Sequence, residues 1–310
     1  MIGALISFVF AMTFGVNQII TRRGVLRASS SYVANISIFS GPVFFLFVTG
    51  ATGDLFKLGN FSWESYAFFA AAGVVHFTLG RTFGYKALFL IGTMRANLIS
   101  SMNGIVTSLL AVLILKEVLT PLIVLGILFS LSGPLIAALK EEMVDTATAK
   151  LTPQGKHIDR ETLYRGLLYG SGAAIFWGSS PILIKMGFDH GGTSVIGNLT
   201  SFSAAALVIA PSLLRVKTRD EILCSDRQCL KLALLSGLTT NIAQLLRFVA
   251  LAFTSAITVS IVSRTIPVWT LLFALIFNRK VDSFNRWVLI GNALLLLGSF
   301  MVIAEQIFRI

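Results

Sequence analysis

The chain has 310 residues, of which 55% are hydrophobic and 13% are charged. Soluble proteins carry about 25% charged residues, so this composition indicates a multi-pass membrane protein and excludes a large soluble core. The net charge of +11 does not indicate nucleic acid binding, because no soluble domain is present to carry such a site. Basic loops beside anionic lipid account for the excess.

Apolar runs of about 20 residues, the length that crosses ~30 Å of hydrocarbon, recur along the whole chain. They predict ten transmembrane helices at 2–20, 32–51, 64–85, 94–115, 120–139, 166–185, 193–214, 231–252, 256–278 and 286–306. Two longer polar segments separate them, 140–165 at the midpoint and 215–230. The second holds Cys224 and Cys229, which we expect to be incidental loop thiols because their spacing and neighbours suit no metal.

A shift of 163 residues aligns the first four predicted helices of the two halves without a gap. FGVNQIITRRG (14–24) falls on WGSSPILIKMG (177–187), and ANISIFS (34–40) falls on GNLTSFS (197–203). A constant offset through separate blocks is not expected from apolar composition alone. The sequence therefore predicts an internal repeat.

The fifth helix needs two extra residues in the second half, after which Gly126 matches Gly291. Each half then holds five spans, and an odd number forces the second half to enter the membrane in the opposite orientation. The predicted fold is an all-α integral membrane protein with ten transmembrane helices as two inverted five-helix repeats. The predicted boundaries are 1–139 for the first repeat, 140–165 for the linker and 166–310 for the second repeat.

These segments resemble a known family. The first helices of the halves (FG at 14–15 and WGSSPILIK at 177–185) and the segments 85–133 and 248–280 resemble the ten-helix branch of the drug/metabolite transporter superfamily, with two EamA-type halves. The resemblance covers essentially the whole chain. It implies a secondary transporter, from a family whose members move amino acids, sugar phosphates, nucleotide sugars, lipid-linked groups and other metabolites.

Charge bias predicts the orientation. The loops after the first, third, fifth, seventh and ninth spans hold most of the lysines and arginines, which favours a cytoplasmic location for them. We therefore expect both termini outside and the central linker inside, in the cell (inner) membrane. Members of the resembled family usually keep both termini in the cytoplasm.

No acidic residue is predicted at the centre of a span. Small four-helix multidrug exporters need a glutamate in the first helix to exchange protons for cationic drugs, whereas the matching positions here are Asn17 and Ser180. Cationic substrates are therefore not expected. The sequence also has no Walker motif, metal-ligand cluster or nucleophile–base pair, so we expect no cofactor, metal or enzymatic activity.

Arg264 is predicted near the centre of the ninth span, where an arginine costs at least about 2.5–3.5 kcal/mol. It shares a helical face with Ser260 and Pro267, and its repeat counterpart is Ser101. We expect it to face a wet cavity and to bind an anion. The structural alternative is a bond to backbone carbonyls that Pro267, which has no N–H, leaves open.

Other polar positions recur at equivalent places in the two halves. Thr78, Arg81 and Tyr85 correspond to Asn241, Gln244 and Phe248, and Phe14 and Asn17 correspond to Trp177 and Ser180. Arg95 and Arg247 are expected to extend to the nearest interface, and His76 is expected to pack, with proton coupling as the alternative. The candidate substrate-binding residues are Arg264, Arg81, Asn241, Gln244, Asn17, Ser101, Tyr85, Trp177, Phe14, Phe248 and His76.

These features predict an alternating-access transporter for a small metabolite that carries a carboxylate or phosphate. Its partners would be that anionic or zwitterionic metabolite and the lipid bilayer, with a coupling proton or counter-substrate left open. Three alternatives remain: an exporter of amino acids or other zwitterions, a lipid-phosphate flippase, and a non-transporting membrane sensor or scaffold.

Overall fold

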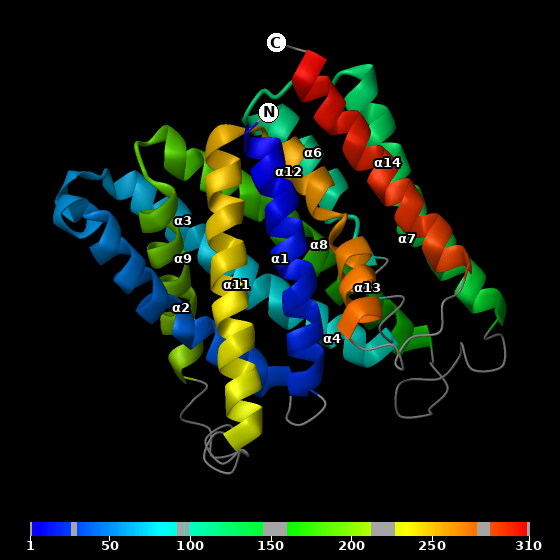
Figure 1. Ribbon diagram of the computed structural model, residues 1–310, viewed down its shortest axis with the longest axis horizontal. Coiled ribbons are helices and arrows are strands. Elements are labelled where there is room, and N and C mark those ends of the chain that lie inside the picture. The colour runs from blue at the N-terminus through cyan, green and yellow to red at the C-terminus, as the bar shows by residue number, and fades with distance from the viewer. Residues whose placement is uncertain are drawn as a thin grey trace.

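The computed structural model describes residues 2–25, 30–91, 96, 99–144, 160–211, 227–277 and 286–308, and these residues contain helices and no strands. Figure 1 shows them as one bundle. The elements of the first half are α1 (Ile2–Val25), α2 (Ser30–Thr52), the 3₁₀ helix η1 (Asp54–Asn60), α3 (Trp63–Gly73), the π-helix η2 (Val74–Gly80), α4 (Arg81–Ile91), α6 (Asn103–Ile114) and α7 (Pro121–Val144). Those of the second half are α8 (Arg160–Asp189), α9 (Ser194–Ile209), α11 (Arg227–Phe253), α12 (Ala256–Ser263), α13 (Ile266–Phe277) and α14 (Arg286–Phe308).

Within the described part of the chain, five helical segments are long and apolar enough to cross a membrane, by length and composition. They are Ile2–Thr21, Tyr32–Thr52, Arg160–Asp189, Arg227–Phe253 and Ala256–Phe273. Four shorter apolar helices accompany them: Asn103–Ile114, Pro121–Gly133, Ser194–Ile209 and Leu289–Glu305. The integral membrane character and the all-helical class are as predicted. The number of ten spans and the repeat boundaries stay predictions.

The helix bounds repeat between the halves. Moving Asn103–Ile114 by 163 residues gives 266–277, the bounds of α13. Moving α7 by 165 residues, which includes the two extra residues expected before the fifth helix, places its start at 286, where α14 begins. The stretch from α3 to α4, residues 63–91, corresponds in the same way to 226–254, within one residue of α11.

The predicted ninth span is not one continuous helix. It breaks at Arg264 and Thr265, between α12 and α13. Pro267 explains the break, because it cannot donate to the carbonyl of Ser263 and its ring would clash there. The equivalent position in the first half, Ser101–Met102, is also a turn. Arg264 therefore lies at the end of a half-helix and not in the middle of a helix.

The most extensive helix contacts join one half to the other. They pair α7 with α14, α1 with α11, α4 with α8 and α2 with both α11 and α9. In Figure 1, α7 and α14 lie together at one side of the bundle, while α1 and α11 run side by side through its centre. The two halves thus interdigitate, and any space at the centre is bordered by both.

The α7–α14 pair is joined at glycines. A Cβ on Gly126 would lie 2.8 Å from the carbonyl oxygen of Gly298, and one on Gly133 would lie 2.4 Å from that of Gly291. The glycine with the smaller residue number in each helix faces the glycine with the larger number in the other. The two helices therefore run antiparallel. Because α7 and α14 are equivalent in sequence, their opposite directions are those that an inverted repeat requires.

One cysteine does not lie where the sequence predicted. Cys229 is 1% exposed within the first turn of α11, whereas a loop position was expected. The helix begins earlier than the apolar run, because Arg227 and Gln228 are good helix formers and extend its first turn. Cys224 lies outside the described residues.

Candidate functional site

A cavity of about 880 Å³ lies between the two halves. Its lining comes from α1, α2, η2, α4, α8, α11, the α12–α13 break and the start of α6. Along α1 it is bordered by residues 10–21, and along α11 by residues 236–247. The cavity therefore borders the middle of both helices and stops short of the first turns of α1 and the last turn of α11.

Beyond the cavity, toward the end of α11, the bundle is filled with apolar side chains. Phe69 and Phe248 lie there with ring centroids 6.1 Å apart, and both are fully buried together with Leu251 and Ile257. Glu117 closes the same region by accepting hydrogen bonds from two backbone amides at the start of α12, Ala256 N at 2.7 Å and Ile257 N at 3.2 Å. A carboxylate at a helix N-terminus is stabilised by the helix dipole.

The charged groups of the cavity are all basic. Arg81, Arg247 and Arg264 line it, the imidazole of His76 lies beside Arg247, and none of the described lining residues is acidic. Within the described part of the chain, no carboxylate forms an ion pair with any of these arginines. A buried guanidinium without a counter-charge costs several kcal/mol, about 2.5–3.5 at a helix centre. The cavity is therefore electrostatically suited to an anion.

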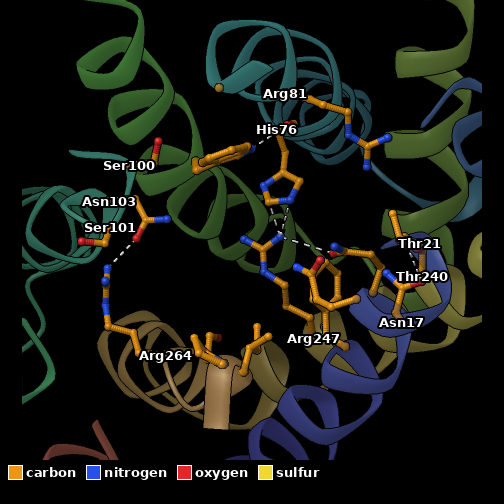
Figure 2. Close-up of a pocket in the computed structure, with 18 of the residues that line it drawn as sticks. Asn17, Thr21, His76, Arg81, Ser100, Ser101, Asn103, Thr240, Arg247 and Arg264 are labelled. Atoms are coloured by element: carbon orange, nitrogen blue, oxygen red, sulfur yellow. Dashed lines mark hydrogen bonds between the residues drawn. The ribbon is translucent and has the colours of Figure 1, made fainter. Parts of the chain in front are cut away.

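The structure places Arg247 at a different position from the one that the sequence predicted. It was expected to extend to an interface, but it is 7% exposed and lines the cavity. Its Nη1 lies 3.4 Å from His76 Nδ1 and donates to Gln244 Oε1 at 3.3 Å, and its Nη2 donates to Ser180 Oγ at 3.4 Å. Figure 2 shows the guanidinium extended toward His76. Its spacing from Gln244 could have predicted this position, because residues three apart along a helix lie on the same face.

His76 belongs to the π-helix η2, whose wider turns leave backbone groups free for other partners. Its carbonyl oxygen accepts a 3.1 Å hydrogen bond from Nε1 of Trp177 in α8. The Trp177 ring fits against two glycines, since a Cβ on Gly80 would lie 2.5 Å from its Cδ1 and one on Gly84 2.7 Å from its Cη2. The tryptophan thus forms a rigid wall of the cavity.

Arg264 reaches across the cavity to the first half. Its Nη2 donates to Oδ1 of Asn103, the first residue of α6, and a Cβ on Gly104 would collide with the guanidinium. The bond described for its side chain is thus to an amide side chain, not to a carbonyl freed by Pro267. The starts of α6 and α13 both border the cavity, and helix N-termini carry partial positive charge that favours an anion.

Neutral donors complete the lining. Asn17 Oδ1 accepts hydrogen bonds from Ser236 Oγ at 3.2 Å and Thr239 Oγ1 at 2.8 Å. Its amide nitrogen forms no hydrogen bond with the described residues, which leaves two N–H groups for a ligand. Arg81 is held by the carbonyl oxygen of Ala34, to which its Nη1 donates at 3.2 Å.

The structure brings most of the predicted residues together. Those that line the cavity are Arg264, Arg81, Gln244, Asn17, Ser101, Tyr85, Trp177, Phe14 and His76. Asn241 and Phe248 do not line it. Asn241 is 1% exposed and donates to Ser40 Oγ at 3.3 Å, between α11 and α2. Phe248 packs in the apolar cluster with Phe69, because it lies beyond the closed end of the cavity.

Broken helices from two sequence-equivalent halves, meeting at a polar cavity inside an apolar helical bundle, are the architecture of membrane transport proteins. The comparisons name the family. The profile of the EamA-like transporter family matches residues 1–139 and 164–304, and the chain belongs to this family. It is thus a multi-pass membrane protein of the drug/metabolite transporter superfamily, as the sequence resemblance implied.

No curated protein matches the chain. Among solved structures, one described only as the crystal structure of a protein has a TM-score of 0.74 at 15% sequence identity. The match covers 97% of this chain and 96% of the other. At this identity the likeness concerns the fold alone.

Proposed function

We propose that this protein is a secondary transporter for a small anionic metabolite that carries a carboxylate or a phosphate. The observation that carries the proposal is the cavity with Arg81, Arg247 and Arg264 on its wall and no acidic residue among its described lining. An anionic ligand would neutralise guanidiniums that otherwise remain uncompensated, and this gain favours its binding over that of a neutral or cationic solute.

Alternating access would follow from movement of one half against the other. The cavity reaches toward the basic-loop end of the bundle, while the apolar cluster around Phe69 and Phe248 and the Glu117 cap fill the other end. With the basic loops in the cytoplasm of a cell with an inner membrane, this conformation faces inward and both termini lie outside. Opening the other side would require Glu117 to leave the two amides of α12.

A lipid-phosphate flippase is the second candidate, and one observation favours it. Tyr85, 39% exposed, lines both the central cavity and a groove between α4 and α8. Lys86 and Arg165 also line this groove, and Lys86 Nζ lies 5.0 Å from the centroid of the Tyr169 ring. A headgroup phosphate could pass from this groove into the cavity if Tyr85 moved aside.

The test is flux in proteoliposomes that contain the purified protein. Vesicles loaded with a mixture of small organic acids and phosphate esters are assayed for exchange with the same labelled compounds outside, and fluorescent anionic lipid is assayed for flipping. Anion exchange should be saturable, should fall at least about tenfold in Arg247→Gln, and should persist in Lys57→Gln. The control removes an equivalent charge at an exposed lysine paired with Asp54 in η1.

Saturable exchange of zwitterionic amino acids without exchange of any anion would reject the proposal in favour of a zwitterion carrier. Lipid flipping without solute exchange would favour the flippase. Absence of all three activities, in protein that remains folded, would support the sensor or scaffold alternative.

A further inference from the structure

We infer that the transported ligand carries two separate anionic groups, one held at Arg264 and the other at Arg247. The inference deepens the proposed function and rests on it. The ligand class that it defines is a short carbon skeleton with an anion at each end, such as a dicarboxylate or a phosphorylated carboxylic acid.

The first argument is the balance of charge. Three guanidiniums line the cavity, and the hydrogen bonds described for them reach only neutral acceptors: amide oxygens, hydroxyls, a carbonyl and an imidazole. A ligand with one negative charge would leave two of the three arginines without a counter-charge. A ligand with two would leave only one of them without a counter-charge. Neutralisation therefore favours the dianion.

The second argument is that Arg247 and Arg264 are anchored by different helices. Arg264, at the α12–α13 break, is bound to Asn103 of α6. Arg247, in α11, is bound to Ser180 of α8 and to Gln244. The hydrogen bonds described for the two guanidiniums have no partner in common, and Figure 2 shows them directed to different sides of the cavity. Each guanidinium therefore offers its remaining N–H groups from its own side of the cavity.

The third argument is that each position retains donors for its own anion. A guanidinium has five N–H groups, and Arg264 is described with one bond and Arg247 with bonds from its two Nη atoms. The unbonded amide nitrogen of Asn17 adds a neutral donor in the same cavity. The N-termini of α6 and α13 add partial positive charge beside Arg264.

The cavity also has room between the two positions. Its volume of about 880 Å³ is at the upper end of the range for pockets that enclose whole organic ligands, roughly 300–1,000 Å³. Phe14, Trp177 and Pro181 contribute apolar surface to the lining. Such surface suits the carbon skeleton that would connect the two anionic ends.

The experiment compares dianions with matched monoanions on the full-length protein, in detergent for binding and in proteoliposomes for flux. The probes are dicarboxylates of four to six carbons and their monomethyl esters, together with phosphoglycolate and glycolate, and the readout is binding by thermal shift and by competition in the flux assay. We expect at least one dianion to bind about tenfold or more tightly than its matched monoanion, since each charged hydrogen-bonded contact contributes on this scale.

Arg264→Gln should remove this preference by lowering dianion affinity to that of the matched monoanion. Lys57→Gln should leave the ratio of dianion to monoanion affinity unchanged. The ratio in the unmodified protein tests the inference even if the Arg264 variant does not fold. Equal or tighter binding of monoanions throughout the panel would overturn the inference and leave the anion transporter standing. Absence of binding and flux for both classes would overturn the proposed function itself, and the inference with it.

Discussion

Thr107 and Thr270, which are equivalent under the 163-residue shift, make the same hydrogen bond across the interface between the halves. Thr107 Oγ1 donates to the carbonyl of Gly178 at 2.9 Å, and Thr270 Oγ1 donates to that of Gly15 at 3.5 Å. Each bond connects the second half-helix of a broken pair to the first helix of the opposite repeat. The two crossings are thus equivalent contacts that join the halves at sequence-related positions.

The close helix contact at Gly178 should tolerate no side chain. A Cβ there would lie 2.6 Å from the carbonyl oxygen of Asn103 and 2.7 Å from Val106 Cβ. We expect Gly178→Ala to lower the free energy of unfolding by about 1–3 kcal/mol through overpacking, which would appear as a lower Tm of the purified protein. The control is Gly50→Ala, where nothing lies within 4 Å. Equal Tm values for the two variants would contradict the close contact.

The geometry of Arg247 matters as well as its charge. Its planar group bonds Gln244 and Ser180 from two nitrogens at once, which a lysine ammonium cannot reproduce. We therefore expect Arg247→Lys to lose at least about tenfold in anion affinity, measured by ligand-induced thermal shift. Retained affinity would mean that only the positive charge is needed.

Asn103→Asp should lower anion affinity without lowering the stability of the protein. The new carboxylate would replace the amide that accepts from Arg264 and would form a buried ion pair, which neutralises that end of the cavity. We expect anion affinity to fall by about tenfold or more while Tm stays equal or rises. Asn103→Ala, which removes the acceptor without adding charge, is the matched variant, and it should retain more affinity than Asn103→Asp.

The Glu117 cap should contribute to the closed end. Glu117→Ala removes the acceptor of two amides at the start of α12, and loss of a helix cap costs about 0.5–2 kcal/mol. We expect a lower Tm together with greater labelling of a cysteine introduced at Phe69, because the closed end would open more often. Glu161→Ala is the control: its pair with Arg165 is exposed and should be worth less than about 1 kcal/mol.

The distribution of basic residues predicts the orientation. A reporter that functions only in the cytoplasm should stay inactive when fused to either terminus and become active when inserted in the linker 145–159. The insertion serves as the positive control for folding and expression. Activity at the C-terminus would place the basic loops outside and would reverse the direction in which the cavity faces.

The sequence repeat predicted much of the fold, because helix bounds follow apolar periodicity and both halves carry the same pattern. The helix breaks were harder to predict. Pro267 signals the break in the second half, but its equivalent is Gly104, which permits a turn without requiring one. Next to the break at Ser101–Met102, the absence of a side chain at Gly104 leaves room for the guanidinium of Arg264, a contact that this part of the sequence does not reveal.

The site was predicted less completely, for two physical reasons. Thr78 was grouped with Arg81 and Tyr85 as a recurring polar position. The π-helix ends at Gly80, between Thr78 and the other two, and changes the rotation per residue; Thr78 Oγ1 is buried without a partner among the described residues. Arg247 was assigned to an interface because burial of a lone cation is costly. Two neutral acceptors make this burial possible. Gln244 is close to Arg247 in the sequence, whereas Ser180 is distant from it.

The glycine-lined contact between α7 and α14 has a consequence for the covalent chain. Each of these helices contacts its partner from the other half far more extensively than its own half, and the contacts between α1 and α11 and between α4 and α8 also cross between the halves. Continuity of the polypeptide through 145–159 is therefore not needed to hold the fold together. Two fragments divided in this segment and produced in the same cell should assemble into an active protein.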